Sequence, residues 1–209
     1  MQAMNGMGKG RLEAFSDGVI AIILTIMVLE IKVPQGTQWQ DLWPLLPVFL
    51  SYVLSFVYVG IYWSNHHHML QTVQHVTGYI LLANLVLLFW LSLLPFATGW
   101  MGQNHFAVVP SVLYGGLLLA CAVSYWLLQK AIIRAHGQDS ALAIAVGKDR
   151  KGRLSLILYS LAIPLNLHWP KLAQGIYVLV ALIWFVPDRR IERTLAWFNS
   201  PEAEVKVES

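Results

Sequence analysis

The chain has 209 residues, of which 57% are hydrophobic and only 12% are charged. Soluble domains carry roughly 25% charged residues, so this composition and the long apolar runs exclude a soluble globular protein and predict a polytopic membrane protein. The formal net charge of +3 is too small to indicate a nucleic-acid partner, and the single cysteine, Cys121, excludes a disulfide framework.

The first apolar run, Leu12–Val33, is long enough to cross a membrane, since a helix rising about 1.5 Å per residue would span roughly 33 Å here. It is not a plain anchor. Asp17 lies near its start, and an ionisable residue inside a membrane segment is costly and indicates a functional site. On a helical wheel one apolar stripe has Thr25 at its edge. The stripe consists of Phe15, Val19, Ile22, Ile26 and Leu29. Its simplest alternative role is contact with lipid or a neighbouring helix.

Five further apolar runs follow the first, separated by short polar turns, and each is long enough for a helix. We expect helices over about 42–68, 78–100, 106–135, 153–167 and 171–186, with 136–152 as the longest loop. Pro95 is expected to kink the third helix near its end. The fold class is therefore all-α, with a six-helix transmembrane domain over residues 1–198 and a disordered acidic tail over 199–209.

Basic residues indicate the orientation of this arrangement. With six helices, only Lys32 and Lys171 lie on the side opposite to the two termini, whereas five or seven helices would scatter the basic residues. The basic residues on the side of the termini are Lys9, Arg11, Lys130, Arg134, Lys148, Arg150, Lys151, Arg153, Arg189, Arg190, Arg193 and Lys206. Because basic loops stay in the cytoplasm, we expect a multi-pass protein with both termini cytoplasmic.

Polar side chains gather near the start of the first helix. A buried carboxylate must be paired or hydrogen-bonded, and Arg11 is too far along the helix from Asp17 to share a face with it. Partners on other helices are therefore expected. Candidate donors are Trp63, Asn65, His66, His67 and His68 in the second helix and Asn84 in the third. The simpler reading is that Asp17 only sits at the membrane interface.

The three consecutive histidines, His66–His68, raise the question of a metal site or an intramembrane metalloenzyme. Consecutive residues on a helix point about 100° apart, so three such histidines cannot all ligate one ion. No H-E-x-x-H or C-x-x-C motif accompanies them. We therefore expect no metal site, no cofactor and no enzymatic activity.

The motif R-x-x-x-F-S-D at residues 11–17, followed by the apolar helix and by LEIKVP at 29–34, resembles the signature of the transmembrane protein 175 family. This family contains a lysosomal potassium channel and bacterial homologues with a single six-helix repeat. The resemblance implies a homotetrameric, K⁺-permeable cation channel in the plasma membrane of a bacterium. It also implies that the first helix of each subunit lines the central pore.

The same resemblance implies roles for individual residues. Ile22 matches the narrowest hydrophobic ring of the family's pore, and Thr25 matches a hydroxyl ring near it that would give a weak preference for K⁺ over Na⁺. Rings of Ile26 and Leu29 would extend the hydrophobic constriction. A structural polar network would hold the first helix in place; its expected members are Arg11, Phe15, Ser16, Asp17, Trp63, His66, His67 and Asn84.

A proton-coupled secondary transporter that uses Asp17 and the histidines after helix two is the alternative function. Such transporters typically have broken helices at corresponding positions in two halves of the chain. Here the first helix is continuous and no internal repeat is visible. The pattern therefore favours the channel.

Overall fold

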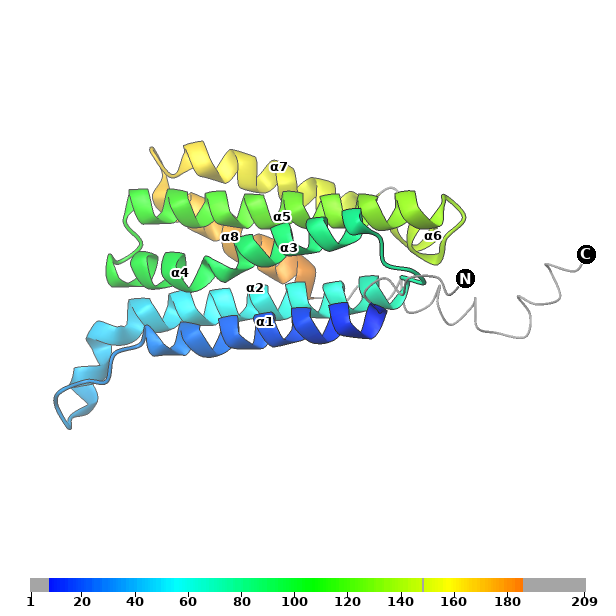
Figure 1. Ribbon diagram of the computed structural model, residues 1–209. Helices are drawn as coiled ribbons and strands as arrows, with labels where there is room; N and C mark the ends of the chain where they lie inside the picture. Colours follow the sequence, from blue (N-terminus) through cyan, green and yellow to red (C-terminus); the bar gives the residue numbers. More distant parts are fainter. Residues whose placement is uncertain (1–7, 148, 186–209) are drawn as a thin grey trace, which may run out of the picture.

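The computed structural model describes residues 8–147 and 149–185, and every regular element within that part of the chain is a helix (Figure 1). In chain order the elements are α1 (Lys9–Leu29), the 3₁₀ helix η1 (Trp39–Leu45), α2 (Leu46–Gln71), α3 (Gly78–Ser92), α4 (Leu94–Gln103), α5 (Val108–His136), α6 (Ala141–Val146), α7 (Arg150–Leu165) and α8 (Pro170–Phe185). The predicted acidic tail, 199–209, lies outside the described residues.

Four helical segments in the described part of the chain are long and apolar enough to cross a membrane. They are Lys9–Leu29, Trp39–Gln71, Gly78–Gln103 and Val108–His136. The all-α membrane fold is thereby confirmed. The helices α7 and α8 have 16 residues each, or about 24 Å at 1.5 Å per residue, which is shorter than a hydrocarbon core of about 30 Å. The count of six spans stays a prediction.

Prolines shift the boundaries of the second and third predicted helices. The second does not start as an α-helix at residue 42, because η1 comes first and α2 begins at Leu46 with Pro47 in its first turn. The third is two helices instead of one kinked helix: α3 ends at Ser92, and α4 begins at Leu94 with Pro95 in its first turn. Proline lacks an N–H and is tolerated where that N–H would have no partner.

The predicted loop 136–152 is also wrong in part, because it contains α6 and the start of α7. Ser140 caps α6 by accepting a hydrogen bond from the Ala143 N–H at 3.4 Å. Asp149 caps α7 in the same way, with 3.1 Å between its Oδ1 and the Gly152 nitrogen. Such caps satisfy amide groups that a helix leaves unpaired, so helices start at them.

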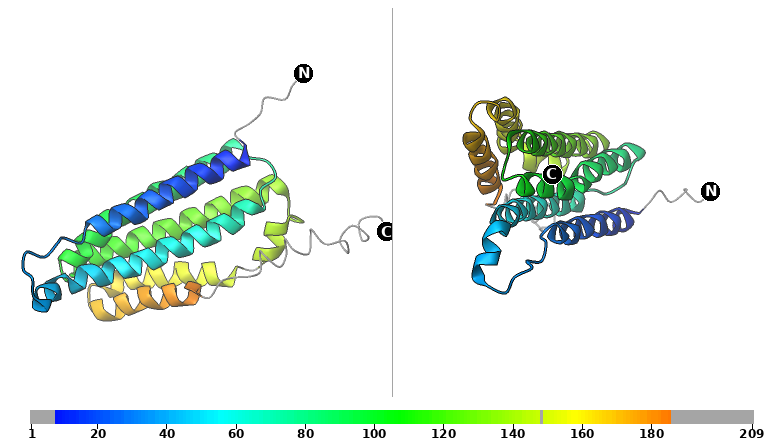
Figure 2. Two further views of the ribbon diagram at one scale, coloured as in Figure 1. Left: turned by 90° about the horizontal axis from the view of Figure 1, so that it is seen from below. Right: turned by 90° about the vertical axis from the view of Figure 1, so that its left-hand side faces the viewer.

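The helices form one elongated bundle with α5 near its centre (Figure 1). Figure 2 shows α1 along one side of the bundle and α7 with α8 on the opposite side. The start of α1, the end of α5 and the start of α7 lie together with α6, and we call this the α6 end. The opposite end carries η1.

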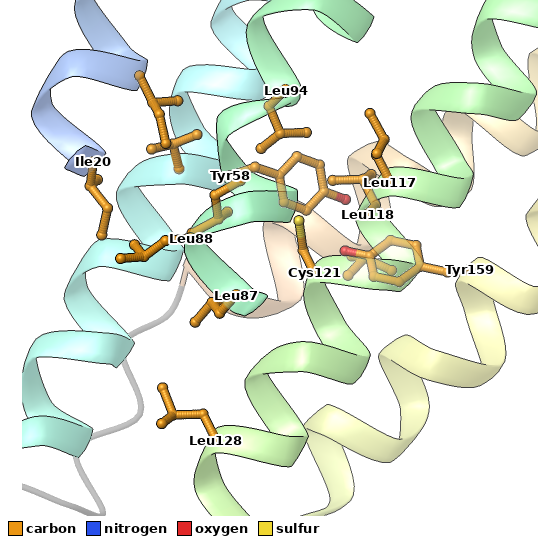
Figure 3. Close-up of a cluster of buried hydrophobic side chains, with 14 of the residues drawn as sticks. Ile20, Tyr58, Leu87, Leu88, Leu94, Leu117, Leu118, Cys121, Leu128 and Tyr159 are labelled. Carbon is orange, nitrogen blue, oxygen red and sulfur yellow. The ribbon is translucent and has the colours of Figure 1, made fainter. Parts of the chain in front are cut away.

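The core joins side chains from most of these helices. Ile20 of α1, Leu87 of α3 and Cys121 of α5 point into the same region (Figure 3). Buried hydroxyls add polar links, since Tyr58 donates to the Tyr177 carbonyl and so connects α2 with α8. The short C-terminal helices are therefore part of the same packed body as α1 to α5.

Candidate functional site

The helix α1 packs through only one of its faces. Its buried residues recur three or four positions apart and contact α2, α3 and α4. They are Leu12, Ser16, Ile20, Ile23 and Met27. The opposite face is uncovered: Phe15 is 53% exposed, Ile22 57%, Ile26 44% and Leu29 77%. The stripe identified in the sequence is thus the face that a single chain leaves open, except that Val19 is half-buried.

Thr25 lies on the exposed side of α1, between the exposed residues Ile22 and Ile26. Its Oγ1 donates a hydrogen bond to the Ile22 carbonyl at 2.9 Å. The hydroxyl proton is therefore used within the helix. The oxygen keeps a lone pair, which can accept a hydrogen bond or coordinate a cation.

A chain of buried hydrogen bonds fixes the other face of α1 to two helices. Asn84 of α3 donates from Nδ2 to Ser16 Oγ at 3.0 Å, and its Oδ1 accepts from His66 Nε2 of α2 at 2.7 Å. Ser16 in turn donates to the Leu12 carbonyl at 2.8 Å. Ser16, His66 and Asn84 are all buried. Buried polar groups that satisfy one another hold their helices in one relative position.

A second polar contact joins α1 to α2 beside the first. Trp63 of α2 donates from Nε1 to Asp17 Oδ1 at 3.0 Å. The Trp63 ring stacks on the His67 ring with 6.1 Å between centroids, and His67 Nε2 lies 3.0 Å from Gln71 Nε2. Asp17 is half-buried, so this contact is shallower than the one through Asn84.

Ser16, Asp17, Trp63, His66, His67 and Asn84 therefore lie in two adjoining hydrogen-bonded groups. Arg11 and Phe15 are exposed and do not join them; the Phe15 side chain has no polar atom. In residues 8–147 and 149–185 the Arg11 side chain has no hydrogen-bond or ion-pair partner.

Two contacts of α1 were not foreseen from the sequence. Lys9 Nζ donates to the Gln71 carbonyl at 2.7 Å, at the α6 end. At the other end of α1, Gln103 Nε2 donates to Glu30 Oε2 at 3.3 Å. Gly99 makes room for that carboxylate, because a Cβ there would lie 2.6 Å from Glu30 Oε2. In the sequence, the spacing of Gly99 and Gln103, four residues apart and so on one face of a helix, could have indicated this contact.

The histidines at the end of α2 diverge, as consecutive residues on a helix do. His66 faces Asn84, whereas His67 lies beside Trp63 and Gln71. Among the residues that the structure describes, no group of three His, Cys, Asp or Glu side chains is placed to hold a metal ion. The chemistry of this region is hydrogen bonding between helices.

Known proteins with similar sequences and folds agree on one family. The family model of the endosomal/lysosomal potassium channel TMEM175 matches residues 11–95. A protein named as a potassium channel in Chryseobacterium sp. (strain P1-3) is 56% identical over 189 residues, which cover 90% of this chain and 98% of that protein. The endosomal/lysosomal proton channel TMEM175 of Mus musculus is 32% identical over 132 residues, covering 57% of this chain and 26% of the mouse protein.

A solved structure has the same fold. The crystal structure of a lysosomal potassium-selective channel TMEM175 homolog from Chamaesiphon minutus superposes with a TM-score of 0.73 at 30% identity. The superposition covers 86% of this chain and 97% of that one. The similarity therefore extends well beyond the first helix.

Proposed function

Because this chain belongs to the TMEM175 family of ion channels, we propose that it is a potassium-permeable cation channel in the cell membrane of a bacterium. Proteins of the family are channels and not enzymes. The bacterial relative that covers 90% of this chain is itself named a potassium channel. We propose K⁺ as the permeant ion and no cofactor.

The observation that carries this proposal is the division of α1 into a fixed face and an open face. The open face is a continuous apolar stripe, and four copies of it around an axis would enclose a narrow passage. Ile22, Ile26 and Leu29 would then form stacked rings about one helical turn, 5.4 Å, apart. Rings of aliphatic side chains form a hydrophobic constriction that closes a pore by excluding water. We therefore propose a homotetramer with α1 lining the pore.

Thr25 supplies the polar group in this passage. A ring of four Thr25 oxygens would replace part of the hydration shell of a passing cation. Each oxygen is held by the bond from its own hydroxyl to the Ile22 carbonyl. Because no row of carbonyls accompanies this ring, we propose a weak preference for K⁺ over Na⁺.

The two hydrogen-bonded groups behind α1 are proposed to hold the pore helix in place. Bonds from Asn84 and Trp63 fix Ser16 and Asp17, and the rest of α1 follows as a rigid helix. Arg11 and Phe15 lie uncovered at the same end. In the tetramer they would contact the neighbouring subunit, which would account for the lack of a partner for Arg11 among the described residues of a single chain.

We further propose six spans, with α7 and α8 as the last two, and both termini in the cytoplasm. Arg134 and Arg153 lie at the α6 end of the bundle, and Lys32 and Lys171 lie at the opposite end. Since basic residues are retained in the cytoplasm, the more basic α6 end would be the cytoplasmic one.

The proposal is tested by recording from the purified protein in a planar bilayer with K⁺ on one side and Na⁺ on the other. We expect an ohmic current with a reversal potential that favours K⁺. Ile22→Asn should increase the conductance several-fold, because an amide in the constriction lets water enter. A saturable flux driven by a pH gradient would instead support a transporter based on Asp17 and the histidines.

Ile157→Asn is the matched control for this experiment. Ile157 is also an isoleucine, is 57% exposed as Ile22 is, and lies on α7, on the side of the bundle opposite to α1 (Figure 2). Its substitution should leave the conductance unchanged. Equal conductance changes in the two variants would contradict a pore along α1.

A further inference from the structure

A groove of about 890 Å³ is lined by residues of α5, α6 and α7. These helices meet at the α6 end of the bundle, on the side away from α1 (Figure 1). Three basic side chains line it. Lys130 and Arg134 come from α5, and Arg153 comes from α7. The fold thus brings to one groove basic residues that are about twenty positions apart in the sequence.

The positive charge of this groove is not neutralised within the described structure. The ion pair found in residues 8–147 and 149–185 joins Lys9 and Glu13, on α1, and leaves the three basic residues of the groove without a carboxylate partner. Asp149 is the acidic residue on the wall, and its Oδ1 accepts the Gly152 N–H as the cap of α7. Three cations therefore face one carboxylate that is already hydrogen-bonded.

The basic residues lie nearer to one end of the groove than its largest apolar side chain does. On α5, Trp126, Lys130 and Arg134 are four residues apart and share one face. Trp126 lies farthest from the α6 end, and Lys130 Nζ lies 5.7 Å from the centre of its ring. On α7, Leu156 follows Arg153 by one turn in the same inward direction. The cationic groups are therefore gathered toward the mouth of the groove, and Trp126 and Leu156 give its inner part an apolar wall.

We propose that this groove binds an anionic phospholipid, with the phosphate on Arg134 and Arg153 and an acyl chain against Trp126 and Leu156. Basic pockets between membrane helices recognise anionic head groups, and arginine matches phosphate with two parallel hydrogen bonds. A free phosphate ion would use only the cationic mouth. The apolar inner wall, on α5 and on α7, which rests on the proposal that α7 is a membrane span, favours a lipid. This site is separate from the proposed pore and adds a ligand to the channel function.

Native mass spectrometry of the full-length protein in detergent tests the proposal. Phosphatidylglycerol, as the anionic lipid, and phosphatidylcholine, as the zwitterionic one, are titrated separately. We expect phosphatidylglycerol to bind more tightly. Arg134→Gln with Arg153→Gln should weaken its binding about 30-fold, because each basic residue near an anionic lipid contributes a factor of about five. Equal binding of the two lipids would overturn the proposal.

Lys32→Gln with Lys171→Gln is the matched control, since it removes two basic residues at the opposite end of the bundle. It should leave phosphatidylglycerol binding unchanged. An equal loss in both double variants would mean general charge attraction and would overturn the site. Displacement of the lipid by millimolar inorganic phosphate would show an ion site instead, and would also overturn it.

Lys130→Gln keeps the test decisive where the arginine variant does not fold. Lys130 is exposed, and its replacement should weaken phosphatidylglycerol binding about fivefold. Size-exclusion chromatography verifies that this variant elutes as the wild-type protein does. Unchanged lipid binding by a correctly folded Lys130→Gln protein would contradict an anionic lipid in this groove, because Lys130 is part of its basic wall.

Discussion

The two faces of α1 have similar hydrophobicity but opposite surroundings. Ile20, Ile23 and Met27 are almost completely buried against other helices, whereas Ile22 and Ile26 are about half exposed. Each face carries a small hydroxyl residue, but only that of Ser16, on the buried face, bonds to another helix, through Asn84; Thr25, on the open face, bonds to a carbonyl of α1 itself. In a membrane, lipid is as apolar as a side chain, so hydrophobicity alone does not choose the inner face. The hydrogen bond between helices does.

Alanine substitutions at two adjacent positions, one on each face of α1, test this difference and should have the largest effect on stability. Met27→Ala should lower the free energy of unfolding by about 2 kcal/mol, because Met27 is 0% exposed and its removal leaves a cavity. This value is at the low end for soluble proteins because the unfolded chain in detergent is not exposed to water. Ile26→Ala should change it by less than about 0.5 kcal/mol. Unfolding is followed by the loss of helical circular dichroism.

The oligomeric state of both variants is measured in parallel by size-exclusion chromatography. Ile26→Ala acts on the proposed pore face, so it is expected to change conductance and to leave the fold of the subunit intact. Equal destabilisation by the two substitutions would mean that both faces of α1 are packed in the folded protein. The distinction between a fixed and an open face would then be wrong.

Removal of the buried hydrogen bonds that Asn84 makes should have the second-largest effect on stability. Asn84→Ala removes the acceptor of His66 and the donor to Ser16, so His66 Nε2 loses its partner and Ser16 keeps only its bond to the Leu12 carbonyl. We expect a loss of about 1 kcal/mol in stability, since hydrogen bonds between membrane helices contribute about 0.6 to 2 kcal/mol each. Thermal unfolding of the purified protein measures it.

Asn104→Ala is the control for this substitution, because in the described part of the chain the Asn104 side-chain amide donates to the nearby Trp100 carbonyl and to no other helix. Its loss should alter the unfolding temperature little. A stability loss as large as that of Asn84→Ala would show that the hydrogen bonds between α1, α2 and α3 contribute no more to stability than a hydrogen bond within one helix.

Helical spacing was sufficient to place Ile22, Ile26 and Leu29 on one face, because the geometry of a helix fixes which residues share a side. The same reasoning identified Trp63, His66 and Asn84 as donors near the start of α1. Which donor meets which acceptor depends on how the helices pack, so the pairing of Asn84 with both Ser16 and His66 could not be read from the sequence.

Sequence reasoning located the interruption of the third helix but not its form. Pro95 predicts a kink near the end of this helix; the missing N–H of the proline removes the bond to the carbonyl four residues earlier, and the chain is divided at Leu93 into α3 and α4, which together still form one apolar segment, Gly78–Gln103. The six-residue helix α6 was too short to show a period. The groove that it closes needs α5 and α7 side by side, which only the folded chain provides.

Thr25→Val tests the open face of α1 and should have the smallest effect in free energy, on ion preference and not on stability. Valine has nearly the shape of threonine, and within the described structure the hydroxyl of Thr25 bonds to its own helix, so the fold and the proposed tetramer should be unchanged. Loss of one ligand oxygen per subunit should lower the K⁺/Na⁺ permeability ratio roughly two- to fivefold, as expected for about 0.5–1 kcal/mol of lost interaction. Thr25→Ser keeps the oxygen and should keep the ratio. The reversal potential under K⁺/Na⁺ gradients measures both variants, and an identical shift in the two would assign the effect to side-chain shape and not to the hydroxyl.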